Sequence, residues 1–373
     1  MIKINDDFDS GNISVISADN PADVHLEIKP DSSADFYQWF CFDVVGEEKT
    51  ALTLQIENAN GASYVGGWKE YSATASYDGE SWFRVPTTFD GKSLTIKHTP
   101  ENGKIRYAYF AAYPATHYRH YIDGVISKEI LLHEDLGKTL DGQTMDYFKF
   151  GSGPLQLWVI ARQHPGESMG SWWMEGFLDA LCDHQNSAAH SLKESATIHI
   201  IPCMNLDGTR RGHLRTNSAG IDLNRAWRNT TKELSPEVFL TREKMRASGV
   251  DFFLDVHGDE AIPNNFVADA KGIPSWTTRL ETLVANYSDL LLNESNDFQT
   301  KDGYPTPPPG KANLDIATNY VAETWDCLSL TLEMPFKDAN VNPDPERGWS
   351  PERCRNFACE HLNVMAKITP QLR

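Results

Sequence analysis

The chain has 373 residues, with 34 Lys and Arg against 52 Asp and Glu, which gives a formal net charge of −18 at pH 7. This length suits one large domain or two smaller ones, and the excess of acid argues against binding nucleic acid through its phosphates. Hydrophobic residues make up 40% of the chain and aromatic residues 11%, which is typical of an ordered globular protein and not of a disordered one.

The sequence gives no sign of export or of a membrane span. The first residues, MIKINDDFDSGNISV, carry acids where a signal peptide has basic residues, and no apolar segment follows them. No stretch approaches the ~20 apolar residues of a membrane-spanning helix. The six cysteines form no CxxC pair and no repeating spacing, which favours reduced thiols over a disulfide framework. We therefore expect a cytoplasmic protein that binds neither a membrane nor nucleic acid, and we leave its oligomeric state open.

The first part of the chain has the texture of a β-rich domain. Short segments of β-forming residues, such as VHLEIKP, TALTLQIEN and KIRYAYFAAY, alternate with turn pairs such as Asn60-Gly61 and Asp78-Gly79. This spacing predicts an antiparallel β-sandwich. We expect it to form an N-terminal domain over residues 1–115.

The remainder, residues 116–373, predicts an α/β domain built on a mixed or parallel sheet. Apolar runs alternate here with helical patterns, and Ser-Pro-Glu at 235–237 and at 350–352 predicts two helix starts, each with a serine cap. The proline-rich segment 304–310 predicts an irregular surface loop. Four runs are apolar enough to be buried strands: 155–163, 196–205, 250–258 and 327–334.

Chemistry-bearing side chains follow or end three of these strands. The first run is followed by His164-Pro165-Gly166-Glu167, the third ends in His257-Gly258, and the last contains Glu333. Ligands of open α/β sheets collect beyond the carboxyl ends of the strands. Two imidazoles and two carboxylates are therefore expected to meet at one rim of the sheet.

The residues expected at this rim of the sheet predict a catalytic metal site. His164 and Glu167 are three residues apart, so a tight turn brings both side chains to one side, and His257 can complete the set from a neighbouring strand. Two His and one Glu suit Zn²⁺, and three protein ligands leave a position open for water, as catalytic zinc requires. A pattern of the HxxE type is common by chance, so its placement at a strand end carries the prediction.

The ordered motifs HPGE, NLDG, GHLRTNSAGIDLNRAW, FLDVHG and LTLEM resemble those of the zinc carboxypeptidases, peptidase family M14 of the carboxypeptidase A superfamily. The chain resembles the cytosolic carboxypeptidase subfamily in particular. The features that carry this resemblance are HPGE in place of HxRE, the RTNSAGIDLNR block, and a preceding β-domain with FDSGNI and YFAAYPATHY. The resemblance covers essentially the whole chain. It implies a mixed-sheet catalytic domain behind the β-sandwich, and a hydrolase: a metalloprotease that removes the C-terminal residue of a peptide or protein tail.

Site roles follow from the resemblance residue by residue. It makes His164, Glu167 and His257 the ligands of one Zn²⁺ per chain, and Glu333 the general base that takes a proton from the metal-bound water. Arg215 would face the carbonyl oxygen as negative charge develops on it. Asn224 and Arg225 match the pair that holds the substrate's terminal carboxylate, for which the guanidinium fork is suited.

Two positions depart from the family pattern. The arginine of HxRE is Gly166 here, an absence that the subfamily shares. The family's mobile tyrosine has no match at the usual spacing before Glu333, and Tyr304 and Tyr320 are the candidates. We favour Tyr304 as the substrate-contacting residue because it lies in a loop that can close, whereas Tyr320 lies in a predicted helix. Lys311 suggests a preference for an acidic terminal residue, but the sequence does not determine which residue is removed.

Other interpretations remain open at this stage. A zinc-dependent deacylase of the aspartoacylase or succinylglutamate desuccinylase type uses similar motifs on a similar fold, although such enzymes usually carry their β-domain after the catalytic part. A non-catalytic module in which the sandwich is the functional part is a third possibility. Asp255 would point the same way as His257 along a strand and can either orient that imidazole or be structural. Arg225 can equally be a buried cation paired with Asp222 or Asp255.

Overall fold

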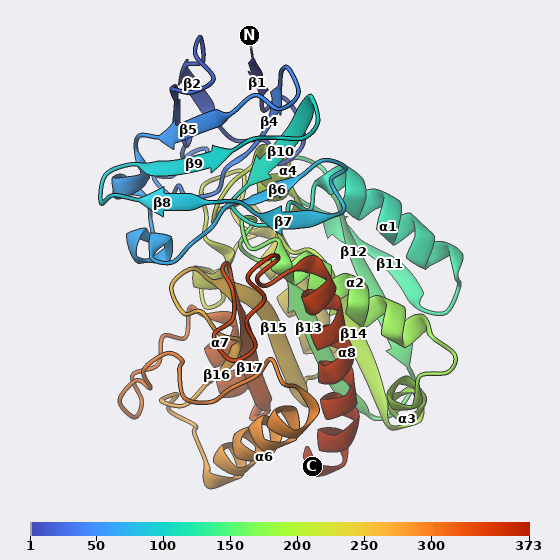
Figure 1. The fold of residues 1–373 in the computed structure, drawn as a ribbon. Coiled ribbons are helices and arrows are strands. Elements are labelled where there is room, and N and C mark those ends of the chain that lie inside the picture. Colours follow the sequence, from blue (N-terminus) through green and yellow to red (C-terminus); the bar gives the residue numbers. More distant parts are fainter. Residues whose placement is uncertain (1) are drawn as a thin grey trace.

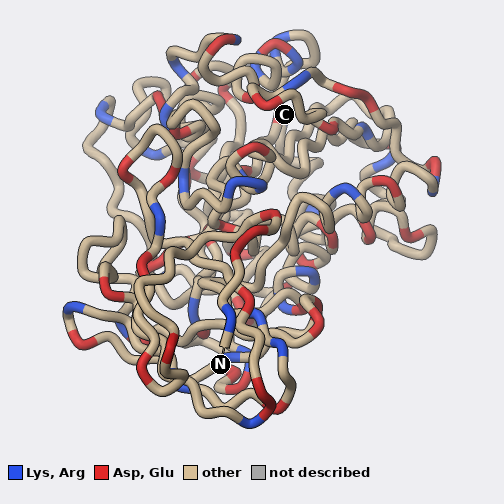
Figure 2. The backbone as a smooth tube through the Cα atoms, turned by 90° about the horizontal axis from the view of Figure 1, so that it is seen from above, with Lys and Arg blue, Asp and Glu red and all other residues tan. Residues whose placement is uncertain are grey.

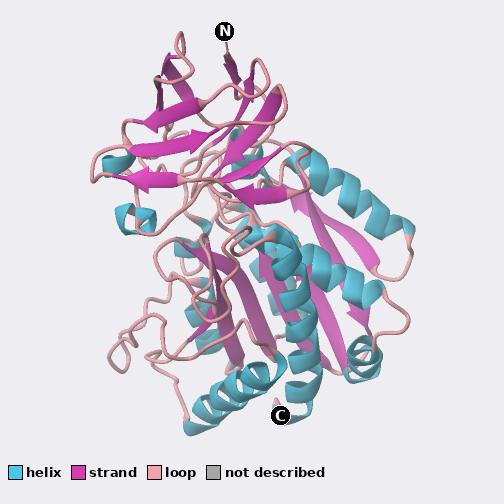
Figure 3. Ribbon diagram, in the orientation of Figure 1, coloured by secondary structure: helices cyan, strands magenta, loops and turns pink. Residues whose placement is uncertain are grey.

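A computed structural model describes residues 2–373 of the chain. The N-terminal part is built from short strands in two sheets, and the C-terminal part from one long sheet with helices on its faces (Figures 1 and 3). This is the predicted fold class, an α/β domain preceded by a β-domain.

The N-terminal part contains two five-stranded sheets. In order across the first sheet the strands are β1 (Lys3–Asn5), β4 (Cys41–Val45), β10 (Lys104–Ala108), β6 (Thr74–Ser76) and β7 (Trp82–Arg84). The second sheet has the order β2 (Ser14–Ser17), β3 (Val24–Glu27), β5 (Leu52–Ile56), β9 (Leu94–His98) and β8 (Thr87–Phe89). Two short 3-10 helices, η1 (Ala59–Gly61) and η2 (Val65–Trp68), follow β5.

Strand pairing in these sheets is antiparallel, as predicted, with one exception. Strands β3 and β5 run parallel. The chain visits β4 in the other sheet between them, and such a crossover allows two strands of one sheet to run in the same direction. Turn signals in the sequence do not reveal a crossover of this kind.

The C-terminal part contains a seven-stranded mixed sheet. Its order is β11 (Leu132–Lys138), β12 (Thr144–Gly151), β14 (Ala196–Ile201), β13 (Leu155–Ala161), β15 (Phe252–Asp259), β17 (Leu328–Pro335) and β16 (Phe266–Asp269). Strands β14, β13, β15 and β17 are parallel to one another and are the four strands that the apolar runs predict. The outer strands pair antiparallel.

Both faces of this sheet are covered, which explains the continuous apolar runs. Along β13, Leu157 and Val159 belong to the main apolar core, whereas Trp158 and Ile160 belong to a second core on the opposite face. The main core includes residues of α1 (Ala115–Ser127), α2 (Met169–Cys182), α3 (Ser187–Ser195), α4 (Leu206–Arg211), α6 (Thr278–Glu294) and α8 (Pro351–Ile368). The second core includes residues of α5 (Pro236–Ser248), η3 (Leu223–Arg225) and α7 (Ala317–Trp325). The last element of the chain is the 3-10 helix η4 (Thr369–Gln371).

The predicted helix starts are confirmed, and one predicted cap is wrong. Helices α5 and α8 begin at Pro236 and Pro351. Ser350 caps α8 by accepting a hydrogen bond from the Arg353 N–H. Ser235 makes no such bond, because its hydroxyl lies 2.8 Å from the Thr230 hydroxyl instead.

The main apolar core extends through both parts of the chain. The main cluster contains side chains from both N-terminal sheets as well as from α2 and α8. Helix α1 begins at Ala115, one residue before the expected start of the second domain at 116. The division into domains at 115/116 stays a prediction.

All six cysteines are free, in line with the reduced thiols that their spacing predicts. Acidic and basic positions are interspersed over the whole chain (Figure 2). Within residues 2–373, no helix has both the length and the apolar character needed to cross a bilayer.

Candidate metal centre and active site

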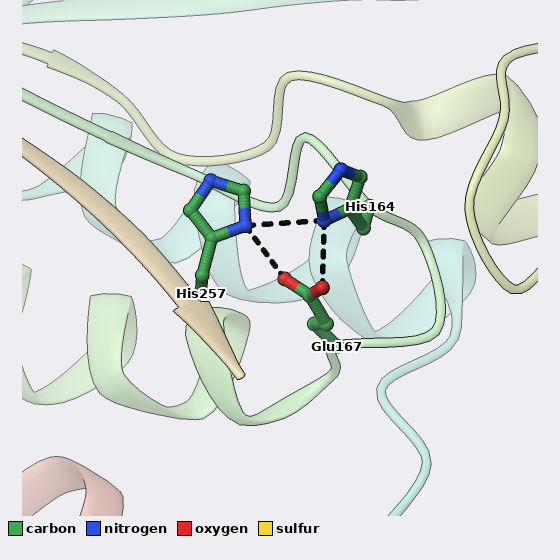
Figure 4. Close-up of side chains that lie close together, drawn as sticks. All are labelled: His164, Glu167 and His257. Carbon is green, nitrogen blue, oxygen red and sulfur yellow. Dashed lines mark hydrogen bonds and ion pairs between the residues drawn. The ribbon is translucent and has the colours of Figure 1, made fainter. Parts of the chain in front are cut away.

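Three potential metal ligands converge at the carboxyl ends of β13 and β15 (Figure 4). Nδ1 of His164 lies 2.6 Å from Oε1 of Glu167, and Nδ1 of His257 lies 2.7 Å from Oε2 of the same carboxylate. The two Nδ1 atoms are 3.2 Å apart. All three side chains are at most 5% exposed. The set is the one that the sequence predicts, and its donor atoms fit one small cation of the Zn²⁺ type.

Two carboxylates hold the far sides of the imidazoles. Asp222 Oδ1 lies 3.1 Å from Nε2 of His164, and Asp255 Oδ2 lies 2.9 Å from Nε2 of His257. A proton on each Nε2 is thereby held by a carboxylate, which leaves the Nδ1 lone pair directed at the centre of the group. Such outer partners fix ring orientation and raise the basicity of metal-binding histidines.

The surroundings of the group favour positive charge. Burial alone would raise the pKa of the Glu167 carboxyl, but the His164 and His257 imidazoles outweigh it and hold that pKa far below its ordinary value. Burial would likewise lower the pKa of His257, but the Asp255 and Glu167 carboxylates raise it well above its ordinary value. A cavity that stabilises imidazolium in this way also suits a dication.

A tight loop carries His164 and Glu167. Arg162, directly after β13, is 1% exposed and has a φ of 62°, which is rare for a residue with a side chain. Its guanidinium donates hydrogen bonds to the Pro165 carbonyl and to the Ser171 hydroxyl, and these two bonds hold the loop against the protein interior.

The same loop explains the glycine that replaces the family's arginine. The Gly166 N–H donates to the Leu214 carbonyl at 2.8 Å, and a Cβ at position 166 would lie 2.8 Å from that oxygen. The close approach of the 214 backbone therefore requires glycine.

Glu333 lies beside the metal group, because it is the register partner of His257 in the parallel pair of β15 and β17. Its Oε1 accepts a hydrogen bond from the Tyr304 hydroxyl at 3.1 Å, while its Oε2 has no hydrogen-bond partner among the described residues. Burial raises the pKa of Glu333 well above its ordinary value. A carboxyl with a free oxygen and a raised pKa is suited to accept and return a proton.

Tyr304 reaches the site from the irregular segment that the sequence predicts. It is 49% exposed, and its single hydroxyl proton lies between two acceptors, Asp259 Oδ2 at 2.8 Å and Glu333 Oε1 at 3.1 Å. Tyr320 lies in α7 and packs against Trp227 and Trp325. Of these two tyrosines, Tyr304 lines the cavity described next.

The metal group opens into a cavity of about 740 Å³. Arg215, Asn224 and Arg225 line it together with His164, Glu167 and Glu333. The Oδ1 of Asn224 accepts a hydrogen bond from the Ala317 N–H at 2.8 Å, and its amide Nδ2 lies 3.4 Å from Nε2 of His257.

The two cavity arginines differ in their partners. Arg215 donates from Nε to Asp222 Oδ2 at 2.7 Å. Arg225 is exposed and donates to the Asn224 carbonyl, and it forms no ion pair with any residue in the described part of the chain. The interpretation of Arg225 as a cation paired with Asp222 or Asp255 therefore does not hold.

Some features of the site were not predicted. The sequence suggests Asp222 as a partner of Arg225, whereas it bridges His164 and Arg215. Tyr64 lines the cavity from the N-terminal part, and no motif marks it. Lys311 is not among the lining residues within 2–373, where Lys271 and Lys301 are the lysines present.

Comparison with known proteins places this site in a family. Residues 121–347 match the family described as zinc carboxypeptidase, and residues 4–110 match the cytosolic carboxypeptidase N-terminal domain. The chain belongs to the zinc carboxypeptidase family and is a cytosolic-carboxypeptidase-like member of it. It is a zinc metallocarboxypeptidase, a hydrolase, as the resemblance implies, and nothing in the comparisons favours the deacylase alternative.

Its relatives cover the chain to different extents. It is 44% identical over 371 residues to an uncharacterized protein of Zymomonas mobilis, covering 97% of that protein. It is 24% identical over 294 residues to mouse cytosolic carboxypeptidase 6, of whose length the matched part spans 54%.

Two solved structures match the whole fold. One is a metallo-carboxypeptidase from Pseudomonas aeruginosa in complex with (2-guanidinoethylmercapto)succinic acid, with 41% identity, a TM-score of 0.97 and full coverage of both chains. The other is a metallo-carboxypeptidase from Burkholderia cenocepacia, with 39% identity, a TM-score of 0.97, and coverage of 99% of this chain and 100% of that one.

Proposed function

We propose that the protein binds one Zn²⁺ through His164, Glu167 and His257 and removes the C-terminal amino acid of peptides or flexible protein tails. The observation that carries this proposal is the convergence of two Nδ1 atoms and one carboxylate beside Glu333, in a cavity that also contains Arg225. A zinc ion held by these three residues would supply Lewis acidity, which would acidify a bound water and polarise the scissile carbonyl.

Glu333 acts as the general base and then as the general acid. Its partner-free Oε2 accepts a proton from the attacking water while the new C–O bond forms at the scissile carbonyl carbon. The same oxygen then delivers the proton to the leaving nitrogen as the C–N bond breaks. The products are a peptide shortened by one residue and a free amino acid.

Two arginines, Arg215 and Arg225, orient the substrate in the cavity. Arg215 lines the cavity and donates to the carbonyl oxygen as charge develops on it. Arg225, whose guanidinium carries no carboxylate partner, binds the terminal carboxylate of the substrate, and Asn224 beside it contributes to this site. An internal peptide bond would present an uncharged amide to Arg225, which accounts for exopeptidase action.

Tyr304 closes over the bound substrate from the exposed loop 304–310. Its hydroxyl already lies between Asp259 and Glu333, so a small movement brings it to the scissile bond. We also propose that the enzyme acts in the cytoplasm and that its two domains comprise residues 1–115 and 116–373.

The proposal is tested with zinc-loaded protein and a set of peptides that differ only in the last residue, analysed by mass spectrometry. We expect loss of single C-terminal residues, and no turnover by Glu333→Gln although it still binds one zinc. Asp302→Asn, which also removes a carboxylate that lines the cavity, is the matched control and should stay active. Internal cleavage, hydrolysis of N-acyl amino acids in preference to peptides, or an active Glu333→Gln variant would contradict the proposal.

A further inference from the structure

A carboxylate of the N-terminal part is buried against the loop that carries Arg215. Asp31 lies between β3 and β4 and is 2% exposed. Its Oδ1 accepts from the Leu214 N–H at 2.6 Å. Its Oδ2 accepts from the Arg215 N–H at 2.9 Å, and from the Thr216 N–H at 2.8 Å and hydroxyl at 3.0 Å. Three successive backbone N–H groups and one hydroxyl thus converge on one side chain, which sets the conformation of that backbone.

The same N-terminal part also contacts the guanidinium of Arg215. The rings of Phe36 and Tyr64 each lie 5.7 Å from its central carbon. Phe36 is tied to Asp31, because the Asp31 N–H donates to the Phe36 carbonyl at 2.8 Å. Cation–π contacts of this kind orient a guanidinium as well as stabilise it.

The segment around Arg215 has no regular secondary structure to set its backbone. Residues 212–222, between α4 and η3, contain no helix or strand. Within the C-terminal part, Leu214 is linked to the metal-binding loop through the Gly166 N–H, and the Arg215 side chain is linked to Asp222. The Asp31 carboxylate is the group that accepts hydrogen bonds from the backbone N–H groups of all three consecutive residues 214–216.

We propose that Asp31 is a positioning residue of the active site, which holds the backbone at residues 214–216 so that the Arg215 guanidinium faces the cavity. This inference rests on the proposed role of Arg215. It makes the N-terminal domain a component of the catalytic apparatus, although Asp31 itself does not line the cavity. A displacement of about 1 Å in a positioned group can lower a rate by about 10²-fold.

A double-mutant cycle on the full-length, zinc-loaded enzyme tests this inference through kcat and KM. Asp31→Asn keeps the shape of the side chain but replaces one acceptor oxygen with a donor, so the four hydrogen bonds can no longer all form. We expect Asp31→Asn to lower kcat by about 10- to 100-fold with a smaller change in KM. In an Arg215→Ala background, the same substitution should lower kcat by less than about 2-fold, since the group it positions is already absent.

A control variant separates positioning from general loosening of the two parts. Arg84 joins the N-terminal part to the carbonyls of Arg347 and Trp349 and does not line the cavity. Arg84→Ala should lower the unfolding temperature and leave kcat unchanged. Thr216→Val, which deletes only the hydroxyl bond to Asp31, serves if Asp31→Asn does not fold, and its smaller loss of kcat should also vanish in the Arg215→Ala background.

The outcomes distinguish this inference from the assignment on which it rests. If Asp31→Asn leaves kcat unchanged, or lowers it by the same factor with and without Arg215, Asp31 does not act through Arg215 and the inference is overturned. If Arg215→Ala itself leaves kcat unchanged, the proposed role of Arg215 fails and the inference fails with it.

Discussion

The exposed guanidinium of Arg225 allows a quantitative prediction about substrate selection. One of its N–H groups donates to the Asn224 carbonyl, and it has no carboxylate partner among residues 2–373. Two of its other N–H groups can therefore donate hydrogen bonds to a substrate carboxylate. Two charge-assisted hydrogen bonds contribute about 1.5–3 kcal/mol each. Because the group is exposed, we take a total near the low end, about 3 kcal/mol, which corresponds to about 10²-fold in kcat/KM.

The assay compares two peptides of one sequence, with a free C-terminal carboxylate or a C-terminal amide. Arg225→Met should reduce the ratio of their kcat/KM values by about 10²-fold. Arg228→Met removes a neighbouring exposed arginine that does not line the cavity and should leave the ratio unchanged. The reasoning is refuted if Arg225→Met keeps the ratio, or if both variants reduce it equally.

Three further predictions concern metal affinity, packing and pH. Asp222→Asn weakens the carboxylate contact to the imidazole of His164, a proposed zinc ligand, and should lower zinc affinity by about 10–100-fold in chelator competition; unchanged affinity would contradict its role. A Cβ on Gly176 of α2 would lie 2.3 Å from the Arg355 carbonyl oxygen of α8. Gly176→Ala should therefore lower the free energy of unfolding by about 1–3 kcal/mol in urea, whereas Gly66→Ala, with open space around it, should change it little. Burial raises the pKa of the Glu237 carboxyl from 4.5 to about 8, so the folded protein keeps a proton that the unfolded chain loses, and this contribution to stability disappears as pH rises through that range. Glu237→Gln should be more stable than the wild type at pH 9 and similar to it near pH 4.5, and equal unfolding temperatures at both pH values would contradict the assignment.

The sequence was sufficient to predict the strands of the C-terminal sheet and the convergence of His164, Glu167 and His257, because both follow from where apolar runs begin and end. Strands covered on both faces must be apolar throughout, so β13 and β15 stand out as continuous runs. Ligands at the carboxyl ends of parallel strands are brought together by the sheet itself, as the register pairing of His257 with Glu333 demonstrates.

Contacts between distant loops could not be predicted, because no periodicity encodes them. Asp222 was named only as one of two possible partners of Arg225, whereas its carboxylate lies against Nε2 of His164 and Nε of Arg215. Tyr64 lines the cavity and Asp31 accepts a hydrogen bond from the Arg215 N–H, and both lie in the N-terminal part, whose sequence predicts only strands and turns. The missing cap at Ser235 has a local cause, since the hydroxyl of Thr230, five residues earlier, contacts its side chain.

Measuring the bound metal is the most direct test of the proposed site at His164, Glu167 and His257. Zinc content and X-ray absorption at the zinc edge, measured on the dialysed wild type and on His257→Ala, report stoichiometry and ligands together. We expect one zinc per wild-type chain, bound by two imidazole nitrogens at about 2.0–2.1 Å and by carboxylate oxygen, and we expect His257→Ala to retain little zinc and no peptidase activity. Equal zinc content in both proteins, or a spectrum with sulfur ligands, would contradict the assignment of His164, Glu167 and His257.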